Sequence, residues 1–285
     1  MAKVKIVVAV LVFSIWMTLI CIVRVNDYIS FGIKDRTFIA RPLNASSFDQ
    51  NIFSDNLTVS VCIPAIPSDM KLSLPRLLES IQTQTHAPLE VIIVMSNVTT
   101  IDCKTFDEEL KSILTSSKLL LYCIHKLQYQ SLSRQNASAL AQGTIISFID
   151  ADDVMYPNRI EVIVAMFLKY KPFMVLHAFS RDVIPPFNDK WKKARIFDGI
   201  ELYDIAENTR SQHAWVMSQM MHSQVSVLRD VCRLVEYRTD KQFYRIEDSW
   251  FVRDVIKYFG RKNNTAIFID TSLTRHVPRE FQTRH

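Results

Sequence analysis

The sequence predicts an α/β fold with a mainly parallel central sheet and helices on both faces of that sheet. From residue 59 onward, short apolar runs alternate with amphipathic stretches of helical spacing, which is the order of β-α-β units. The run at 89–95 is almost continuously apolar, as in a strand that is covered on both faces. A chain of 285 residues with 48% hydrophobic composition is long enough to bury one large core.

Each predicted element rests on a local pattern of apolar, proline and glycine residues. Short β-rich runs predict strands at 59–63, 89–95, 119–124, 144–149, 173–176, 224–228 and 266–270. Helical spacing of apolar side chains predicts helices at 73–81, 105–113, 133–141, 157–167 and 250–259. Pro75 and Pro157 fit the first turns of two of these helices, and Gly143 fits the C-terminal cap of another.

The N-terminal part has a different character from the rest of the chain. Residues 6–23 are an uncharged, mostly apolar run of 18 residues, which predicts a transmembrane signal anchor. Lys3 and Lys5 precede the run and favour a cytosolic N-terminus at 1–5. The alternative is a cleaved signal peptide, although the run ends in Cys-Ile-Val-Arg rather than in small residues.

This topology predicts a single-pass type II membrane protein, with a stem at 24–56 and a domain at 57–285 in the lumen of the Golgi or ER. Asn-X-Ser/Thr triplets agree with a glycoprotein; they begin at Asn44, Asn56, Asn97, Asn136 and Asn263. The cysteines outside the anchor are Cys62, Cys103, Cys123 and Cys232. They could form two disulfides in an oxidising lumen. Buried free thiols are the other interpretation, since Cys62 and Cys123 fall in predicted strands.

Charge and glycine content exclude several classes of function. The net charge of +5 is spread along the chain, so we expect no nucleic-acid partner. There are only 4 glycines, and none forms the Gly-rich loop of dinucleotide-binding or P-loop enzymes. A site for a diphosphate would therefore need a metal ion and basic side chains.

An acidic turn, Asp150-Ala151-Asp152-Asp153, follows the predicted strand at 144–149. Carboxylates held this close repel one another unless a cation neutralises them. Mg²⁺ and Mn²⁺ take oxygen ligands, often one or two carboxylates together with substrate phosphates. A solvated turn that caps the following helix is the alternative for this motif taken alone.

Three groups of residues, taken in order, resemble the family 2 type of inverting glycosyltransferases, which have the GT-A fold. Residues 133–153 resemble the family's Arg-x-Asn helix, glycine, strand and DxDD motif. Residues 61–64 look like its first strand, and Glu247-Asp248 resembles its later acidic pair. The resemblance runs from about residue 57 to residue 276.

The resemblance implies a metal-dependent transfer of a sugar from a nucleotide-sugar donor, most simply a UDP-sugar, to a hydroxyl of a glycan, protein or lipid. Asp150 and Asp152, with Asp153 nearby, would hold Mn²⁺ or Mg²⁺ against the diphosphate. Asp248 would be the general base, and inversion would follow from direct displacement. Glu247 would orient Asp248, or both would simply cap a helix.

The resemblance also implies a position near the nucleotide for Arg134. The family's second strand commonly ends in an acidic residue that contacts the base, whereas this chain has Ser96 there. Base recognition would therefore use Ser96 or a different residue. Arg275 and His276 could reach the metal or diphosphate, or form a solvated basic tail.

Two other functions are compatible with parts of this pattern. The missing acidic residue near Ser96 would also suit a catalytically inactive, GT-A-like carbohydrate-binding or partner protein. A GT-A-like nucleotidyltransferase is less consistent, because residues 64–70 contain no glycine for a phosphate loop. Residues 181–220 are irregular and are predicted to be a variable insertion that shapes the acceptor side.

Overall fold

The computed structural model describes residues 53, 56–180, 202–204, 222–240, 243, 246–259 and 266–277, all within the unit Asn44–His285. The predicted cytosolic segment 1–5, the anchor 6–23, nearly all of the stem 24–56 and most of the insertion 181–220 lie outside these residues. Among the described helices, none is long and apolar enough to cross a membrane. Type II topology therefore stays a prediction.

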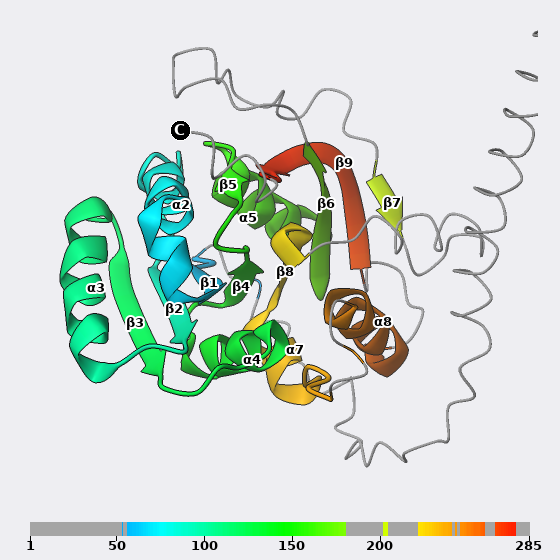
Figure 1. The fold of residues 1–285 in the computed structure, drawn as a ribbon. Coiled ribbons are helices and arrows are strands. Elements are labelled where there is room, and N and C mark those ends of the chain that lie inside the picture. The colour runs from blue at the N-terminus through cyan, green and yellow to red at the C-terminus, as the bar shows by residue number, and fades with distance from the viewer. Residues whose placement is uncertain are drawn as a thin grey trace, which may run out of the picture. The chain divides into compact units, whose positions relative to one another are not determined.

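Nine described strands form one sheet in the order β3-β2-β1-β4-β8-β6-β9-β5, with β7 paired to β9 (Figure 1). The strands are β1 (Val59–Ala65), β2 (Glu90–Ser96), β3 (Lys118–Ile124), β4 (Ile145–Phe148), β5 (Val154–Met155), β6 (Met174–Ser180), β7 (Leu202–Asp204), β8 (Val225–Leu228) and β9 (Ala266–Arg275). All seven strands predicted from the sequence are present. The short β5 and β7 were not predicted, because two or three residues carry no periodicity.

The sheet has a parallel half and a mixed half. Strands β3, β2, β1 and β4 run parallel, with Cys62 on β1 aligned to Ile92 on β2 and to Phe148 on β4. β8 runs antiparallel to both β4 and β6, and β9 runs parallel to β6. The predicted mainly parallel sheet is thus confirmed for the first half, whereas the second half is mixed.

Helices cover both faces of the parallel half. The helices are α2 (Ser73–Gln82), α3 (Thr100–Ile113), α4 (Gln130–Leu140), α5 (Arg159–Tyr170), α7 (Arg229–Leu234) and α8 (Glu247–Phe259), with short 3-10 turns η3 (Pro67–Lys71) and η4 (His222–Gln224). The β1-α2-β2 and β2-α3-β3 crossovers run in one direction along the sheet, and β3-α4-β4 runs back. Because such crossovers are right-handed, α2 and α3 lie on one face and α4 lies on the other.

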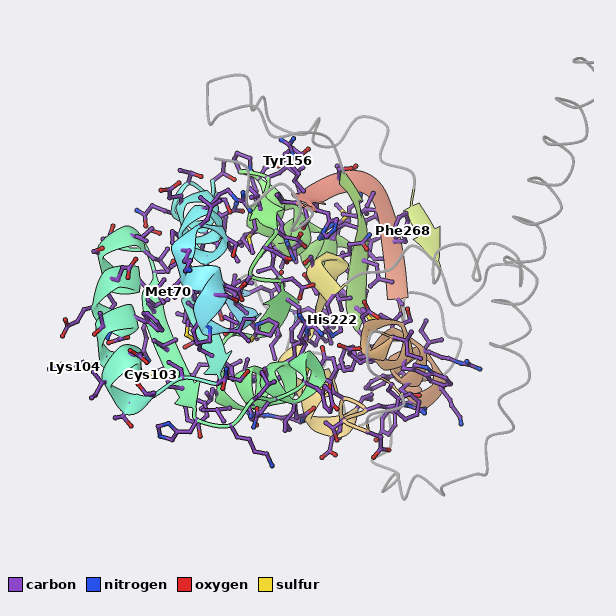
Figure 2. The ribbon with its side chains drawn as sticks, viewed as in Figure 1. Met70, Cys103, Lys104, Tyr156, His222 and Phe268 are labelled. Atoms are coloured by element: carbon purple, nitrogen blue, oxygen red, sulfur yellow. A yellow bond between two sulfur atoms is a disulfide. The ribbon has the colours of Figure 1, made fainter. Side chains whose placement is uncertain are left out.

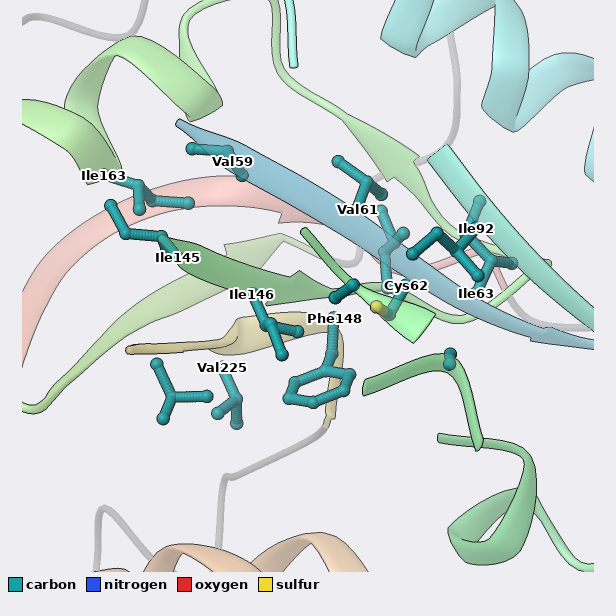
Figure 3. Packing of buried hydrophobic residues seen from close by; sticks show 14 of the residues in the cluster. Val59, Val61, Cys62, Ile63, Ile92, Ile145, Ile146, Phe148, Ile163 and Val225 are labelled. Atoms are coloured by element: carbon teal, nitrogen blue, oxygen red, sulfur yellow. The ribbon is translucent and has the colours of Figure 1, made fainter. Parts of the chain in front are cut away.

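The buried strands form a continuous aliphatic core. Val61, Ile63 and Ile92 on β1 and β2 are fully buried, and Ile146 and Phe148 continue this core on β4 (Figure 3). Burial of one such side chain is worth about 1.5–3 kcal/mol. This core fixes the carboxyl ends of β1, β2 and β4, where the acidic turn begins.

Gly143 has a different role from the predicted helix cap. α4 ends at Leu140 and its C-terminal cap is Ala141. A Cβ atom on Gly143 would lie 2.6 Å from the backbone nitrogen of Ser60 and 2.7 Å from its Oγ. Gly143 is therefore required by the close approach of the α4–β4 connection to β1. Its N–H donates to Ser60 Oγ at 2.8 Å, which fixes the start of β4.

The four cysteines divide between the two predicted possibilities. Cys103 on α3 and Cys123 on β3 form a disulfide (Figure 2). Cys62 and Cys232 are buried free thiols. Burial is the main cause that raises the pKa of both thiols, that of Cys232 to about 12. Both therefore behave as small apolar side chains.

Replacing Cys103 and Cys123 together by serine is expected to destabilise the domain by about 3 kcal/mol, since the disulfide restricts the unfolded chain. The two residues are separated by 20 positions. Denaturant unfolding of the wild type and the double variant would measure the difference. A reducing agent should lower the stability of the wild type and leave the double variant unchanged. Equal sensitivity of both proteins to reduction would contradict this role.

Candidate active site

The acidic turn lies at the carboxyl ends of the parallel strands, where ligands bind in open α/β sheets. Asp153 N–H donates to the carbonyl of Asp150 at 3.1 Å and closes the turn. Asp150 N–H donates to Ser223 Oγ of η4 at 2.9 Å. The chain then enters β5, which pairs antiparallel with the end of β9. The turn is thus held from both sides by elements that are distant in sequence.

The carboxylates of the turn differ in exposure. The Asp150 side chain is 16% exposed, and Asp152 is partly exposed. Asp153 is only 1% exposed, and its Oδ1 lies 2.9 Å from His276 Nδ1. Since an ionised carboxylate only accepts, Nδ1 is the donor. Burial raises the pKa of Asp153, and the hydrogen bond from His276 opposes that rise.

The position of His276 follows from strand register. β5 aligns Val154 with Arg275, so the residue before Val154 faces the residue after Arg275. Arg275 is only 3% exposed, and the His276 side chain is 23% exposed. His276 therefore contacts the acidic turn and Arg275 is buried, so neither residue belongs to a solvated basic tail. The sequence could not show this, because β5 has only two residues.

Arg134 connects the acidic turn to the start of α8. Its side chain is 2% exposed and donates to Asp150 Oδ1 at 2.5 Å and to Glu247 Oε1 at 3.4 Å. It also donates to Gln130 Oε1 at 3.2 Å. Burial alone would lower the pKa of Arg134, but the charge of Asp150 helps to raise it above its usual value. Arg134 is therefore a permanent cation between two carboxylates.

Asp248 has the protonation behaviour of a general base. Burial raises the pKa of Asp248 to about 6, while the charge of Arg134 opposes this rise and that of Glu247 adds to it. Its Oδ1 accepts the N–H of Ser249 at 2.8 Å. A carboxylate with this raised pKa is ionised at neutral pH and is a stronger proton acceptor than an ordinary aspartate. Glu247 is 5% exposed and held by Arg134, which suits a role in orientation.

An aromatic cluster borders Arg134 on the side of the core. His222 stacks on Phe148 with ring centroids 5.3 Å apart, and Tyr237 lies edge-on to His222 at 5.0 Å. Burial lowers the pKa of His222 far below its usual value, and the charge of Arg134 lowers it further. His222 is therefore neutral. These rings exclude water and strengthen the ion pairs of Arg134.

Two arginines near the turn were not predicted. Arg76 on α2 donates from Nη2 to the carbonyl of Asp152 at 3.2 Å. Arg159, at the start of α5, is fully buried below the turn. Burial lowers the pKa of Arg159 to about 9, and the charges of Asp153 and Asp150 oppose that shift. A single arginine in an amphipathic segment gives no motif that a sequence could reveal.

Ser96 lies at the same edge of the sheet as the acidic turn. It ends β2, is 1% exposed and is aligned with Ile124 on β3. Asn97 then adopts a left-handed conformation with φ of 62° before α3 begins. β1 lies between β2 and β4, so Ser96 and Asp150 belong to different parts of this edge. Base recognition by Ser96 stays a prediction.

Asp150 and Asp152 are the carboxylates of the turn that a divalent cation could reach. Within the described parts of the chain, no three His, Cys, Asp or Glu side chains come together as a metal site. Asp150 and Asp152 remain partly exposed on one turn, whereas Asp153 is buried against His276. Mg²⁺ is commonly held by one or two carboxylates together with substrate phosphates. The predicted third carboxylate, Asp153, has the least access to such an ion.

Residues 60–228, more than half of the chain, match the model of "Glycosyl transferase family 2". The protein belongs to this family. In this glycosyltransferase the matched region contains Arg134 and the acidic turn, and it ends before the α8 carboxylates. No curated protein matches the chain.

Solved structures support the GT-A fold of this family 2 glycosyltransferase. TarS 1–349 of S. aureus in complex with UDP-GlcNAc is 14% identical, with a TM-score of 0.57 over 80% of this chain and 62% of that chain. A longer TarS structure is covered for only 37% of its length. Glucosyl-3-phosphoglycerate synthase from Mycobacterium tuberculosis, in complex with phosphoglyceric acid, is 14% identical, with a TM-score of 0.52 over 80% of this chain and 74% of that chain.

Proposed function

We propose that the protein transfers a sugar from a nucleotide-sugar donor to an acceptor hydroxyl, with Asp248 as the base. The observation that carries the proposal is the double contact of Arg134 with Asp150 and Glu247. It brings the acidic turn next to the carboxylate pair that starts α8. A donor diphosphate at the turn and an acceptor hydroxyl at Asp248 would then lie close together. Direct attack from the side of Asp248 would invert the anomeric centre.

Asp150 and Asp152 would hold Mn²⁺ or Mg²⁺ on the donor side. When bound, the ion would neutralise the charge that develops on the diphosphate. Arg134, Arg76 and Arg159 interact with carboxylates of the turn and lower the repulsion between them. Asp248 accepts the proton of the attacking hydroxyl, and Glu247 is held by Arg134 beside it.

Related structures suggest the donor class. One TarS structure holds UDP and another holds UDP-GlcNAc. A uridine diphosphate sugar is therefore the first donor to test on this chain. The acceptor is a glycan, protein or lipid. The disulfide Cys103–Cys123 supports the proposed oxidising lumen of the Golgi or ER, with the anchor 6–23 in the membrane.

Asp152→Ala is expected to remove the Mn²⁺ dependence of donor binding, because it deletes one of the two partly exposed carboxylates of the turn. UDP binding would be titrated by calorimetry with and without Mn²⁺ or Mg²⁺. Asp107→Ala on α3 is the matched control, since it removes a carboxylate that pairs with Lys111 on the surface of that helix. An Asp152→Ala variant with wild-type Mn²⁺ dependence would contradict the proposed metal site. Donor binding without any turnover would favour the carbohydrate-binding alternative.

A further inference from the structure

Arg159 is a fully buried arginine that makes its hydrogen bonds within the core. It begins α5, and its guanidinium donates to Thr274 Oγ1 at 2.6 Å, Ser147 Oγ at 3.0 Å and the Phe148 carbonyl at 2.7 Å. Burying a guanidinium carries a large desolvation cost, and apolar side chains of similar volume often stabilise a core as well or better. Overall stability is therefore a weak reason for a charge at this position.

The three partners of Arg159 belong to the two strands that frame the acidic turn. Ser147 and Phe148 end β4, which leads directly into Asp150. Thr274 lies at the end of β9, two residues before His276. In the sheet order, β8 and β6 separate β4 from β9. The guanidinium therefore joins strand ends that the sheet itself does not pair.

A second layer of hydrogen bonds continues from these partners to the turn. Thr274 Oγ1 donates to the Ser223 carbonyl at 2.9 Å, and Ser223 Oγ accepts the N–H of Asp150 at 2.9 Å. His276, which follows β9, forms a hydrogen bond with Asp153 and so connects β9 to the other end of the turn. Arg159 is thus connected to both ends of the Asp150–Asp153 turn through groups that are buried or nearly so.

We propose that Arg159 is a positioning residue for glycosyl transfer: it fixes the ends of β4 and β9 to each other, and so holds the acidic turn and His276 in one arrangement for the donor diphosphate. This inference rests on the proposed function and adds to it a residue without direct substrate contact. The positive charge of Arg159 also offsets the repulsion between Asp150 and Asp153. It acts from within the core, where a donor would not reach.

The test compares Arg159→Met, which keeps the length and loses the hydrogen bonds, with Ile163→Ala in the same helix. Ile163 is fully buried in the core, so its truncation should lower stability without moving the turn. We expect Arg159→Met to raise the Kd of UDP with Mn²⁺ and the donor KM by about tenfold and to lower kcat/KM by about 100-fold, the size of effect that a misplacement of 1 Å produces. Ile163→Ala should lower Tm and leave Kd and KM within twofold.

Two results would overturn the proposal: wild-type kcat and KM in Arg159→Met, or equal losses in both variants at equal Tm. If Arg159→Met does not fold, Thr274→Val replaces it, because it deletes the hydroxyl between Arg159 and Ser223. That variant should raise the donor KM several-fold, and an unchanged KM would overturn the proposal.

A measurement that needs no activity separates this inference from the proposed function. The hydrogen-bonded Nδ1–H of His276 can be followed by NMR in ¹⁵N-histidine-labelled protein and assigned with His276→Gln. The signal should be lost in Arg159→Met and kept in Ile163→Ala. Its persistence in Arg159→Met overturns the positioning role. Absence of UDP binding and transfer in the wild type would instead contradict the proposed function.

Discussion

Asp248→Asn is expected to lower kcat by about 10²–10⁴, the contribution of a positioned general base. The wild-type enzyme should show kcat/KM constant above pH 7 and falling tenfold per pH unit well below the Asp248 pKa of about 6. The sign follows from the role of the carboxylate, which must be ionised to accept a proton. Initial rates across pH 5–8 would measure both effects.

The same residue gives a control that reports on folding instead of rate. The pKa of Asp248 is about 6 in the folded chain and 3.8 in its usual range, so the wild type loses folding free energy as pH rises from about 4 to about 6. Asp248→Asn is therefore expected to be more stable than the wild type at pH 8, by up to about 3 kcal/mol, and to lose this advantage as pH falls toward 4. An inactive variant with lower stability at pH 8 would indicate misfolding. Full activity in Asp248→Asn would exclude it as the base.

Arg134→Ala is expected to have the largest effect on both activity and stability. It leaves the carboxylates of Asp150 and Glu247 without the buried cation that they share, and breaking a buried ion pair in this way costs about 3–5 kcal/mol. Because Arg134 lowers the pKa of Asp248, its removal should raise that pKa further. In the pH profile of any residual activity, the fall of kcat/KM on the acidic side would then begin at a higher pH.

The control for Arg134 keeps the charge and changes the geometry. Lysine can contact one carboxylate but lacks the planar guanidinium that reaches two groups at once. Arg134→Lys should recover part of the lost stability and leave transfer strongly impaired. Denaturant unfolding and initial rates would be measured on both variants. Equal activity of Arg134→Lys and wild type would contradict the bridging role.

Most of the parallel half of the fold could be predicted from the sequence because its signals are local. The strand at 89–95 and the helix beginning near Pro75 show clear apolar patterns. The bounds differ from the prediction by a few residues, except in α3, which begins five residues earlier at Thr100. There Thr99 caps the helix by accepting the N–H of Asp102, and few apolar residues mark the first turn.

The site could be predicted only where its residues belong to motifs. Asp150 and Arg134 were recognised by spacing, but their mutual ion pair was not expected. The position of Arg134 near the nucleotide stays a prediction, and the structure adds that this side chain is buried between two carboxylates. Arg159 and the contact of His276 with Asp153 depend on strand pairing over long sequence distances, which residue patterns do not contain.

The hydrogen bond between Asp153 and His276 joins residues 123 positions apart. During synthesis, the β4 strand and the acidic turn therefore emerge long before their partner strand β9. Until β9 docks, the turn holds its carboxylates close together without His276 or Thr274 beside them. Contacts of such long range form late, since the loop between them must first be closed. A nascent or C-terminally shortened chain would thus acquire the parallel half of the sheet well before it acquires a competent donor site.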